Sequence, residues 1–334
     1  MSVIHLIAEK AKGHCEKIIF EVGKTPHSYY QGQQKSLRDQ MFSLAEWNLL
    51  IEKNLDVHLR KELHETGIIS GGGVFDSVRV HFQFVELGHL KSAIFYFTQS
   101  MNLNLVPPSL DLKTLSGGIY VISNSHPFYL NALTFQISEA YQRLGLSLRI
   151  FSEYSFAEDW HSLNTQNSKI NVLINNSEAC LFNSRLNKEV LQSALEASEM
   201  GKVVFLLLPI EGVITALQSS LEISKRESPY YGKSRWVNRL KIHISQRVIH
   251  VVGNESHVLS EVLPINELVA KMLINDDLDS VIDILDQSPE NSGIVGLDQC
   301  LLQQLIRRKI DIKKAFELTR NPEKFDQRLK KVGL

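Results

Sequence analysis

The stretch that decides the fold is GGIYVISNSHPFYLNAL, residues 117–133. Four apolar or aromatic residues follow its glycine pair, which predicts a buried strand. A polar turn comes next, and the apolar-periodic run Ala132–Leu144 predicts a helix. A strand, a tight loop and a helix form the layout of a phosphate-binding loop, and also that of an ordinary turn between a strand and a helix.

The side chains that such a loop needs are missing from this turn. Phosphate binding calls for glycines whose N–H groups close around the phosphates, a lysine for the outer phosphates and a hydroxyl for Mg²⁺. The turn instead contains Pro127, which has no N–H, and the bulky Phe128 and Tyr129. Leu130 and Asn131 stand where lysine and serine or threonine would be needed.

Length and composition indicate a protein of two or three domains with an ordinary buried core. The net charge of −1 gives no global case for binding nucleic acid or membrane. Cys15, Cys180 and Cys300 lie far apart, make no metal or redox pattern and fit a reducing cytoplasm. No run reaches the roughly 18 apolar residues of a membrane helix, and the N-terminus is unlike a signal peptide, so we expect any membrane association to be peripheral. We expect a cytoplasmic protein without metal or cofactor.

The first part of the chain predicts a small α+β domain, residues 1–104, followed by a linker at 105–114. Residues 1–14 suit a short helix, and Lys17–Val22 suits a strand. A long helix is predicted over 42–63, with Ser43 as its N-cap. The glycine triplet at 71–73 predicts a hairpin turn, and the alternating residues from Val78 onward predict a half-buried strand.

Residues 115–334 predict an α/β domain, because strands alternate with helices as in a parallel sheet. The run Lys202–Leu208 is continuously apolar, as in a strand buried on both faces. From Asn266 onward the chain is mostly helical. The segment Lys225–Arg247 is locally basic, and we interpret it as a solvated face or subunit contact rather than a nucleic-acid site.

Several stretches, in order and at matching intervals, resemble the type IV pilus retraction and type II secretion ATPase family. They are EKIIFEVGKTP at 16–26, VRVH at 78–81, SALEASEMGKVVF at 193–205, ISQRVI at 244–249 and GLDQCL at 296–301. The resemblance implies an N-terminal PAS-like domain, a C-terminal RecA-like domain with a helical end-piece, and cytoplasmic hexameric rings. These rings would lie beneath a membrane-embedded assembly platform at the inner face of the cytoplasmic membrane.

The same resemblance marks where this chain departs from the family's ATPase motifs. The family's phosphate loop, GPTGSGKS, falls on Asn124, Ser125, His126, Pro127, Phe128, Tyr129, Leu130 and Asn131, without its glycines, lysine or final serine. The acidic box retains one carboxylate, Glu153. The end of the family's magnesium-positioning strand falls on Asn183-Ser184. If the matching strand is instead the run 170–174, its end falls on Asn175-Asn176. Neither end carries a carboxylate. The histidine motif falls on Pro209.

We therefore expect a catalytically inactive pseudo-ATPase, because phosphoryl transfer depends on groups that are missing together. It would act as a structural or regulatory part of a pilus or secretion machine, as a hexamer or in a complex with an active pilus motor or the inner-membrane platform protein. The alternative is a sensor, in which the cleft that binds nucleotide in the family binds another small molecule, such as a cyclic nucleotide. An unrelated enzyme built on the neighbours Ser125 and His126 lacks a nucleophile motif.

Overall fold

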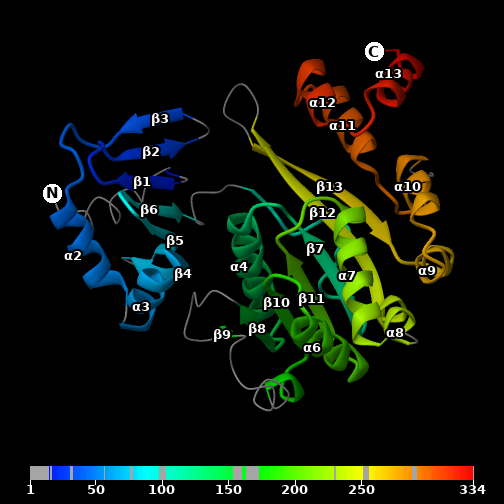
Figure 1. Cartoon of the computed structure of the whole chain (residues 1–334). Coiled ribbons are helices and arrows are strands. Elements are labelled where there is room, and N and C mark those ends of the chain that lie inside the picture. The colour runs from blue at the N-terminus through cyan, green and yellow to red at the C-terminus, as the bar shows by residue number, and fades with distance from the viewer. Residues whose placement is uncertain are drawn as a thin grey trace. The chain divides into compact units, whose positions relative to one another are not determined.

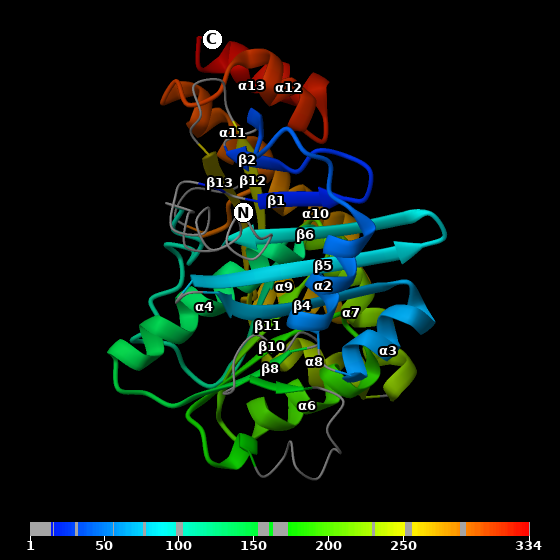
Figure 2. The ribbon, with the colours of Figure 1, turned by 90° about the vertical axis from the view of Figure 1, so that its left-hand side faces the viewer.

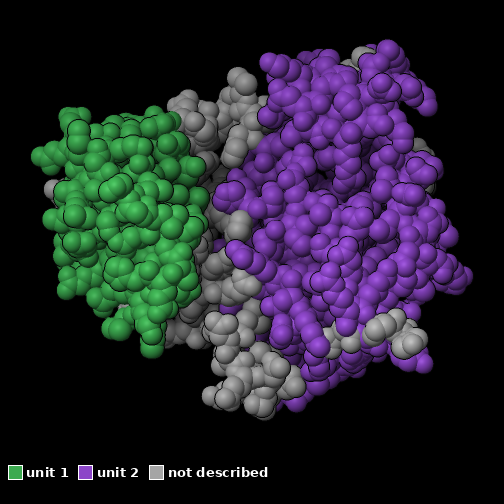
Figure 3. Space-filling view, in the orientation of Figure 1, with its two compact units in different colours: residues 1–103, 154–160 green, residues 104–153, 161–334 purple. Residues whose placement is uncertain are grey.

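The computed structural model describes residue 15 and the ranges 17–30, 33–55, 57–75, 78–97, 103–152, 160–162, 173–228, 231–250, 256–287 and 292–333. The chain forms two compact units, coloured separately in Figure 3. The first contains residues 1–103 with 154–160, and the second contains 104–153 with 161–334. The predicted helix at 1–14 lies outside the described residues.

The first unit is a six-stranded antiparallel sheet in the order β3-β2-β1-β6-β5-β4. Its elements are β1 (Lys17–Glu21), β2 (His27–Tyr30), β3 (Gln33–Ser36), α2 (Leu44–Asn54), α3 (Val57–Thr66), β4 (Ile68–Phe75), β5 (Val78–Leu87) and β6 (Leu90–Phe97). The two helices pack on one face of the sheet (Figure 2), where Trp47 and Leu63 join buried phenylalanines of the strands. The predicted α+β class of this unit is confirmed.

Two details of this unit differ from the sequence prediction. The single helix over 42–63 is wrong, because the chain leaves α2 at Leu55 in extended conformation and starts α3 at Val57. The hairpin turn at 71–73 is also wrong, because the three glycines belong to β4 and pair with β5, Gly71 opposite Phe82. The cross-strand register with β5 therefore overrides the low strand propensity of glycine.

The second unit is built on a seven-stranded sheet in the order β13-β12-β7-β11-β10-β8-β9. Strands β12, β7, β11, β10 and β8 run parallel, and β13 is antiparallel to β12. The strands are β7 (Gly118–Ser123), β8 (Leu148–Ser152), β9 (Trp160–Ser162), β10 (Ala179–Asn183), β11 (Val203–Leu208), β12 (Leu240–His250) and β13 (Ser256–Pro264). The predicted α/β class with a mainly parallel sheet is confirmed.

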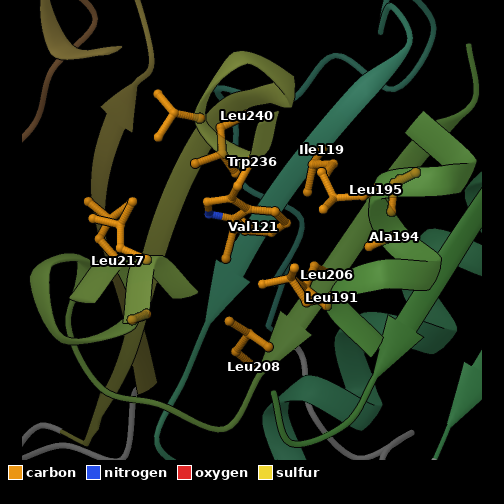
Figure 4. Packing of buried hydrophobic residues seen from close by; sticks show 14 of the residues in the cluster. Ile119, Val121, Leu191, Ala194, Leu195, Leu206, Leu208, Leu217, Trp236 and Leu240 are labelled. Carbon is orange, nitrogen blue, oxygen red and sulfur yellow. The ribbon is translucent and has the colours of Figure 1, made fainter. Parts of the chain in front are cut away.

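Helices cover both faces of this sheet, which explains its continuously apolar strands. They are α4 (Pro127–Arg143), α6 (Lys188–Glu199), α7 (Val213–Glu227), α8 (Gly232–Arg239), α9 (Glu267–Ile274) and α10 (Leu278–Gln287). Ile119 and Val121 of β7 face the cluster that α6, α7 and α8 complete around Trp236 (Figure 4). The alternate residue Tyr120 faces the other way, and both it and Tyr141 of α4 contact the ring of Phe205.

The helical end-piece consists of α11 (Leu297–Ile306), α12 (Ile312–Leu318) and α13 (Pro322–Lys331). These helices pack on the far half of the long β12–β13 hairpin (Figure 1), where Ile249 and Leu259 share a separate core with Leu301 and Phe325. The predicted end-piece is thus confirmed. Among the helices that the structure describes, none is long and apolar enough to cross a membrane.

Candidate functional site

The turn between β7 and α4 lies at the carboxyl end of the parallel sheet, where ligands of such folds bind. The backbone N–H of Asn124 donates to the carbonyl of Leu208 at the end of the neighbouring strand β11, at 3.1 Å. The Asn124 side-chain oxygen then accepts from the backbone N–H of His126 at 2.9 Å. This local hydrogen bond closes a compact turn of the kind that asparagine favours.

Helix α4 begins at Pro127, five residues before the predicted start at Ala132, so that prediction is wrong. Proline is well suited to the first helical position, because its missing N–H would have no partner there and its φ is already helical. His126 is the N-cap, and the Tyr129 N–H bonds to the His126 carbonyl at 3.1 Å. Only Asn124, Ser125 and His126 therefore lie between β7 and α4.

This early helix start changes what the predicted loop can do. Of the eight positions aligned with the phosphate loop, residues 127–131 are helical. Pro127 has no N–H, and the Tyr129 N–H already bonds to the His126 carbonyl, so neither residue offers the free N–H group that a glycine-rich loop directs at phosphate. Ser125 and His126 are exposed at the turn, and the His126 ring packs edge-on against that of Tyr129, with 5.5 Å between centroids.

Leu130 and Asn131, at the lysine and serine positions, are buried in the first turns of α4. Their exposed fractions are 1% and 0%. The Leu130 side chain thus faces the interior of the unit, not the solvent side of the turn. An unpaired lysine at this depth would carry a large desolvation cost, so the local packing suits an apolar side chain.

The structure brings Asn131 into direct contact with Asn183, the last residue of β10. The side-chain N–H of Asn183 donates to the Asn131 side-chain oxygen at 2.6 Å and to the hydroxyl of Thr134 at 3.2 Å. All three side chains are buried. Two positions that lie far apart in the sequence therefore form a closed, neutral pair, which joins the position aligned with the final serine of the phosphate loop to the end of the strand that the resemblance assigns to magnesium.

Two of the remaining predicted site positions, Ser184 and Pro209, lie at the same edge of the sheet. Ser184 is buried, and its hydroxyl donates to the Arg185 carbonyl at 3.1 Å. Pro209 is half-buried in the loop after β11. Glu153 lies outside the described residues. The alternative strand at 170–174 is wrong, because residues 173–175 are helical and β10 fills that place in the sheet.

Glu261 of β13, which no sequence motif marks, lies at the N-terminus of α7. Its carboxylate oxygen Oε2 accepts from the Val213 N–H at 3.3 Å and from the guanidinium of Arg320 at 2.6 Å. A carboxylate stabilises a helix N-terminus through the helix dipole, and Gly212 offers no side-chain cap. The anion at this helix end is thus supplied by the chain itself. A carboxylate inside the apolar run at 258–263 was the signal available in the sequence.

Three buried polar atoms near the turn have no hydrogen-bond partner among the described residues. They are the Ser123 hydroxyl oxygen and the side-chain nitrogens of Asn124 and Asn131. All three are neutral, so the buried edge of the sheet carries no charge at these positions. Within the described ranges, no three His, Cys, Asp or Glu side chains gather to form a metal site.

The asparagine pair is expected to stabilise the unit, and Asn183→Ala tests it. The substitution leaves the buried Asn131 oxygen without its donor, which costs about 1–3 kcal/mol of unfolding free energy. Urea unfolding of the variant measures this loss. Ser184→Ala is the matched control, because Ser184 is equally buried but its hydroxyl bonds to the carbonyl of the next residue and not to a distant side chain. Equal losses in the two variants would contradict the role of the pair.

This two-unit architecture, with its strand–turn–helix at the carboxyl end of a parallel sheet, is the fold of the pilus retraction and secretion ATPases. The pilus retraction motor PilT with bound ADP matches with a TM-score of 0.71 and 16% identity, covering 98% of this chain and 99% of that one. The ATPase DotB of Legionella pneumophila matches at 0.69 and 15%, covering 93% of each chain. DotB of Yersinia pseudotuberculosis matches at 0.65 and 13%, covering 94% and 90%.

The fold that the sequence resemblance implies is therefore confirmed. No protein-family model matches the sequence, and no curated protein sequence matches it either. The likeness is thus one of architecture at low identity, and the chemistry of this chain depends on its own side chains.

Proposed function

We propose that this chain is a catalytically inactive relative of the pilus retraction and secretion ATPases. The observation that carries the proposal is the Asn131–Asn183 hydrogen bond of 2.6 Å. In nucleotide-hydrolysing motors with a phosphate loop, a Ser or Thr of the loop and an acidic residue at the end of a nearby strand hold Mg²⁺. Here Asn131 at the loop position binds Asn183, and the neighbouring Ser184 stands at the position of the acidic residue, so this pair of strand-end residues carries no carboxylate.

The surroundings of the turn support the same proposal. Phosphoryl transfer needs charge neutralisation by a lysine and a metal ion, together with a loop that positions the phosphates. Leu130 at the lysine position is 1% exposed, and the connection before α4 is three residues long. A substitution that restored one of these groups, such as the lysine, would still leave the phosphate-positioning loop and the metal ligands missing.

Calorimetric titration of the purified protein with Mg-ATP tests the proposal. We expect no heat of binding up to millimolar nucleotide, whereas micromolar affinity would refute it. The retraction motor whose structure contains ADP is the positive control. The double variant Leu130→Lys/Asn131→Ser replaces both side chains and leaves the helix start unchanged, so we expect it not to bind either. A cyclic nucleotide in the same titration tests the sensor alternative.

We further propose that the protein serves as a structural or regulatory subunit of a pilus or secretion machine. A subunit that keeps the motor fold but does not cycle can join a ring or contact an active motor or the membrane platform protein. Light scattering at micromolar concentration separates these roles, since a hexamer supports ring building and a monomer supports an adaptor. Co-purification from the native host then identifies the partner.

A further inference from the structure

The helical end-piece is strongly basic in a chain that is otherwise acidic. Residues 297–334 contain ten Lys and Arg against five Asp and Glu, a net side-chain charge of +5, whereas the whole chain carries −1. Much of this charge is neutralised locally, as in the ion pairs Lys314–Glu317, Lys324–Asp286 and Lys330–Asp326. Arg307, Arg308 and Lys313, at the turn between α11 and α12, are not neutralised in this way within the described residues.

This turn, residues 306–313, presents cations and isoleucines together. Arg307, Arg308 and Lys313 are exposed, and none of them forms an ion pair within the described residues. Ile306 directly precedes Arg307 and Ile312 directly precedes Lys313, and these isoleucines are 56% and 52% exposed. The turn also contains Asp311, whose carboxylate accepts the Lys314 N–H at 2.7 Å as the N-cap of α12.

The backbone of this turn favours glycine at a position where the chain has arginine. Arg308 has a φ of 55°, in the left-handed region that side chains other than glycine and asparagine rarely adopt. Its N–H bonds to the Leu305 carbonyl and the Lys309 N–H to the Gln304 carbonyl, both at 2.8 Å. These two bonds form the helix-ending motif in which glycine is usual. The chain therefore keeps a cation here against its local conformational preference.

We propose that the 306–313 turn binds the surface of a membrane rich in anionic phospholipids. Cations beside such a surface are attracted by the negative headgroups, and neighbouring apolar side chains enter the boundary between headgroups and acyl chains. The exposed Ile306 and Ile312, each next to a cation, fit this layered environment. A nucleic-acid backbone would attract the cations and leave the isoleucines in water, so lipid matches both halves of the turn.

The expected binding is reversible and sensitive to salt. Each Lys or Arg close to an anionic bilayer strengthens partitioning by about fivefold. Removing Arg307, Arg308 and Lys313 together is therefore expected to weaken partitioning by about a hundredfold. Because charges near the surface are screened over about 10 Å at 0.1 M salt, binding should fall steeply as salt is raised.

Sedimentation of the full chain with vesicles tests the proposal. The vesicles are pure phosphatidylcholine or phosphatidylcholine containing about one third phosphatidylglycerol, at low salt. We expect binding only to the anionic vesicles, and loss of binding in Arg307→Gln/Arg308→Gly/Lys313→Gln. No binding to anionic vesicles by the wild-type chain, or equal binding by this variant, would overturn the proposal.

Two further variants separate a specific surface from general charge. Lys35→Gln/Lys53→Gln/Lys61→Gln removes the same charge from exposed positions of the first unit and should bind like the wild type. Ile306→Ser/Ile312→Ser keeps the charge and should bind anionic vesicles several-fold more weakly. Undiminished binding by the isoleucine variant, together with retention on a polyanionic heparin column, would identify a site for an acidic macromolecule and overturn the membrane assignment.

Folding of the variants is checked independently of binding. Arg308→Gly relieves the left-handed strain at that residue, so this single variant should unfold at the same or a higher temperature than the wild type. It should nevertheless bind anionic vesicles about fivefold more weakly. A variant that is at least as stable yet binds less cannot owe its defect to misfolding.

Discussion

Trp236→Ala is expected to lower the free energy of unfolding of the second unit by about 3–5 kcal/mol. The indole is completely buried where α8 meets the sheet, among side chains of β7, α6 and α7 (Figure 4). Its ring nitrogen donates to the hydroxyl of Ser220 on α7 at 3.1 Å. The substitution would therefore remove the largest side chain at this junction, leave a cavity and deprive the Ser220 oxygen of its donor.

Urea unfolding followed by circular dichroism measures this effect, with two variants for comparison. Trp236→Phe retains most of the buried volume but not the N–H, and we expect it to cost about 1–2 kcal/mol. Leu268→Ala removes a side chain of α9 that is 56% exposed, and we expect a change within about 0.5 kcal/mol. A cost for Trp236→Ala near that of Leu268→Ala would show that the junction does not depend on the indole.

His243→Leu is expected to remove a large part of the acid sensitivity of the second unit. His243 of β12 is 1% exposed, and neither ring nitrogen has a hydrogen-bond partner among the described residues. Burial lowers the pKa of this imidazole to about 3. The folded state therefore keeps it neutral, whereas the unfolded state binds a proton below a pKa of about 6.5.

The sign of the pH effect follows from this difference. Between pH 6.5 and about pH 3 the unfolded state holds one more proton at this position, so stability falls as pH falls. The loss from His243 at pH 5 is about 2 kcal/mol relative to neutral pH. Urea unfolding of the wild type and the variant at pH 7 and pH 5 isolates the contribution of His243, because the two proteins share all other histidines.

At pH 7 the same substitution should cost little. Leucine has a similar volume and brings no polar atoms into a site that offers none of them a partner, so we expect a change of less than about 1 kcal/mol. A variant with the wild-type dependence on pH would mean that His243 gains a proton, or a partner, in the folded state.

Sequence patterns predicted the elements whose signal is a long apolar run. The strands β7 and β11 were clear because both of their faces are buried, so almost every residue is apolar. The helix α6 was clear because its apolar residues recur at helical spacing and Gly201 follows it. Local patterns could not predict elements that depend on tertiary pairing. The glycines of β4 are an example, because they have no side-chain preference for a strand and are held there by pairing with β5.

The sequence alone predicted which ATPase side chains are missing from the candidate site. It did not predict which of the residues that replace them contact each other. The sequence marks Asn131 and Asn183 as neutral replacements, yet their hydrogen bond joins residues 52 positions apart and depends on how α4 packs against β10. The early start of α4 had a local signal in Pro127, which suits the first position of a helix. The partnership of Glu261, Arg320 and the α7 N-terminus depends on three distant segments and had no local pattern beyond a carboxylate in an apolar strand.

The three-residue connection between β7 and α4 also makes gain of a phosphate loop harder than its loss. Single substitutions can exchange the side chains of Leu130 or Asn131, but they cannot lengthen the connection. A glycine-rich loop there would require unwinding the first turn of α4 and exposing its buried residues, or inserting residues before Pro127. Each intermediate along such a route would lose packing before it gained a ligand, so descendants of this chain are expected to diversify on their surfaces while this edge of the sheet stays as it is.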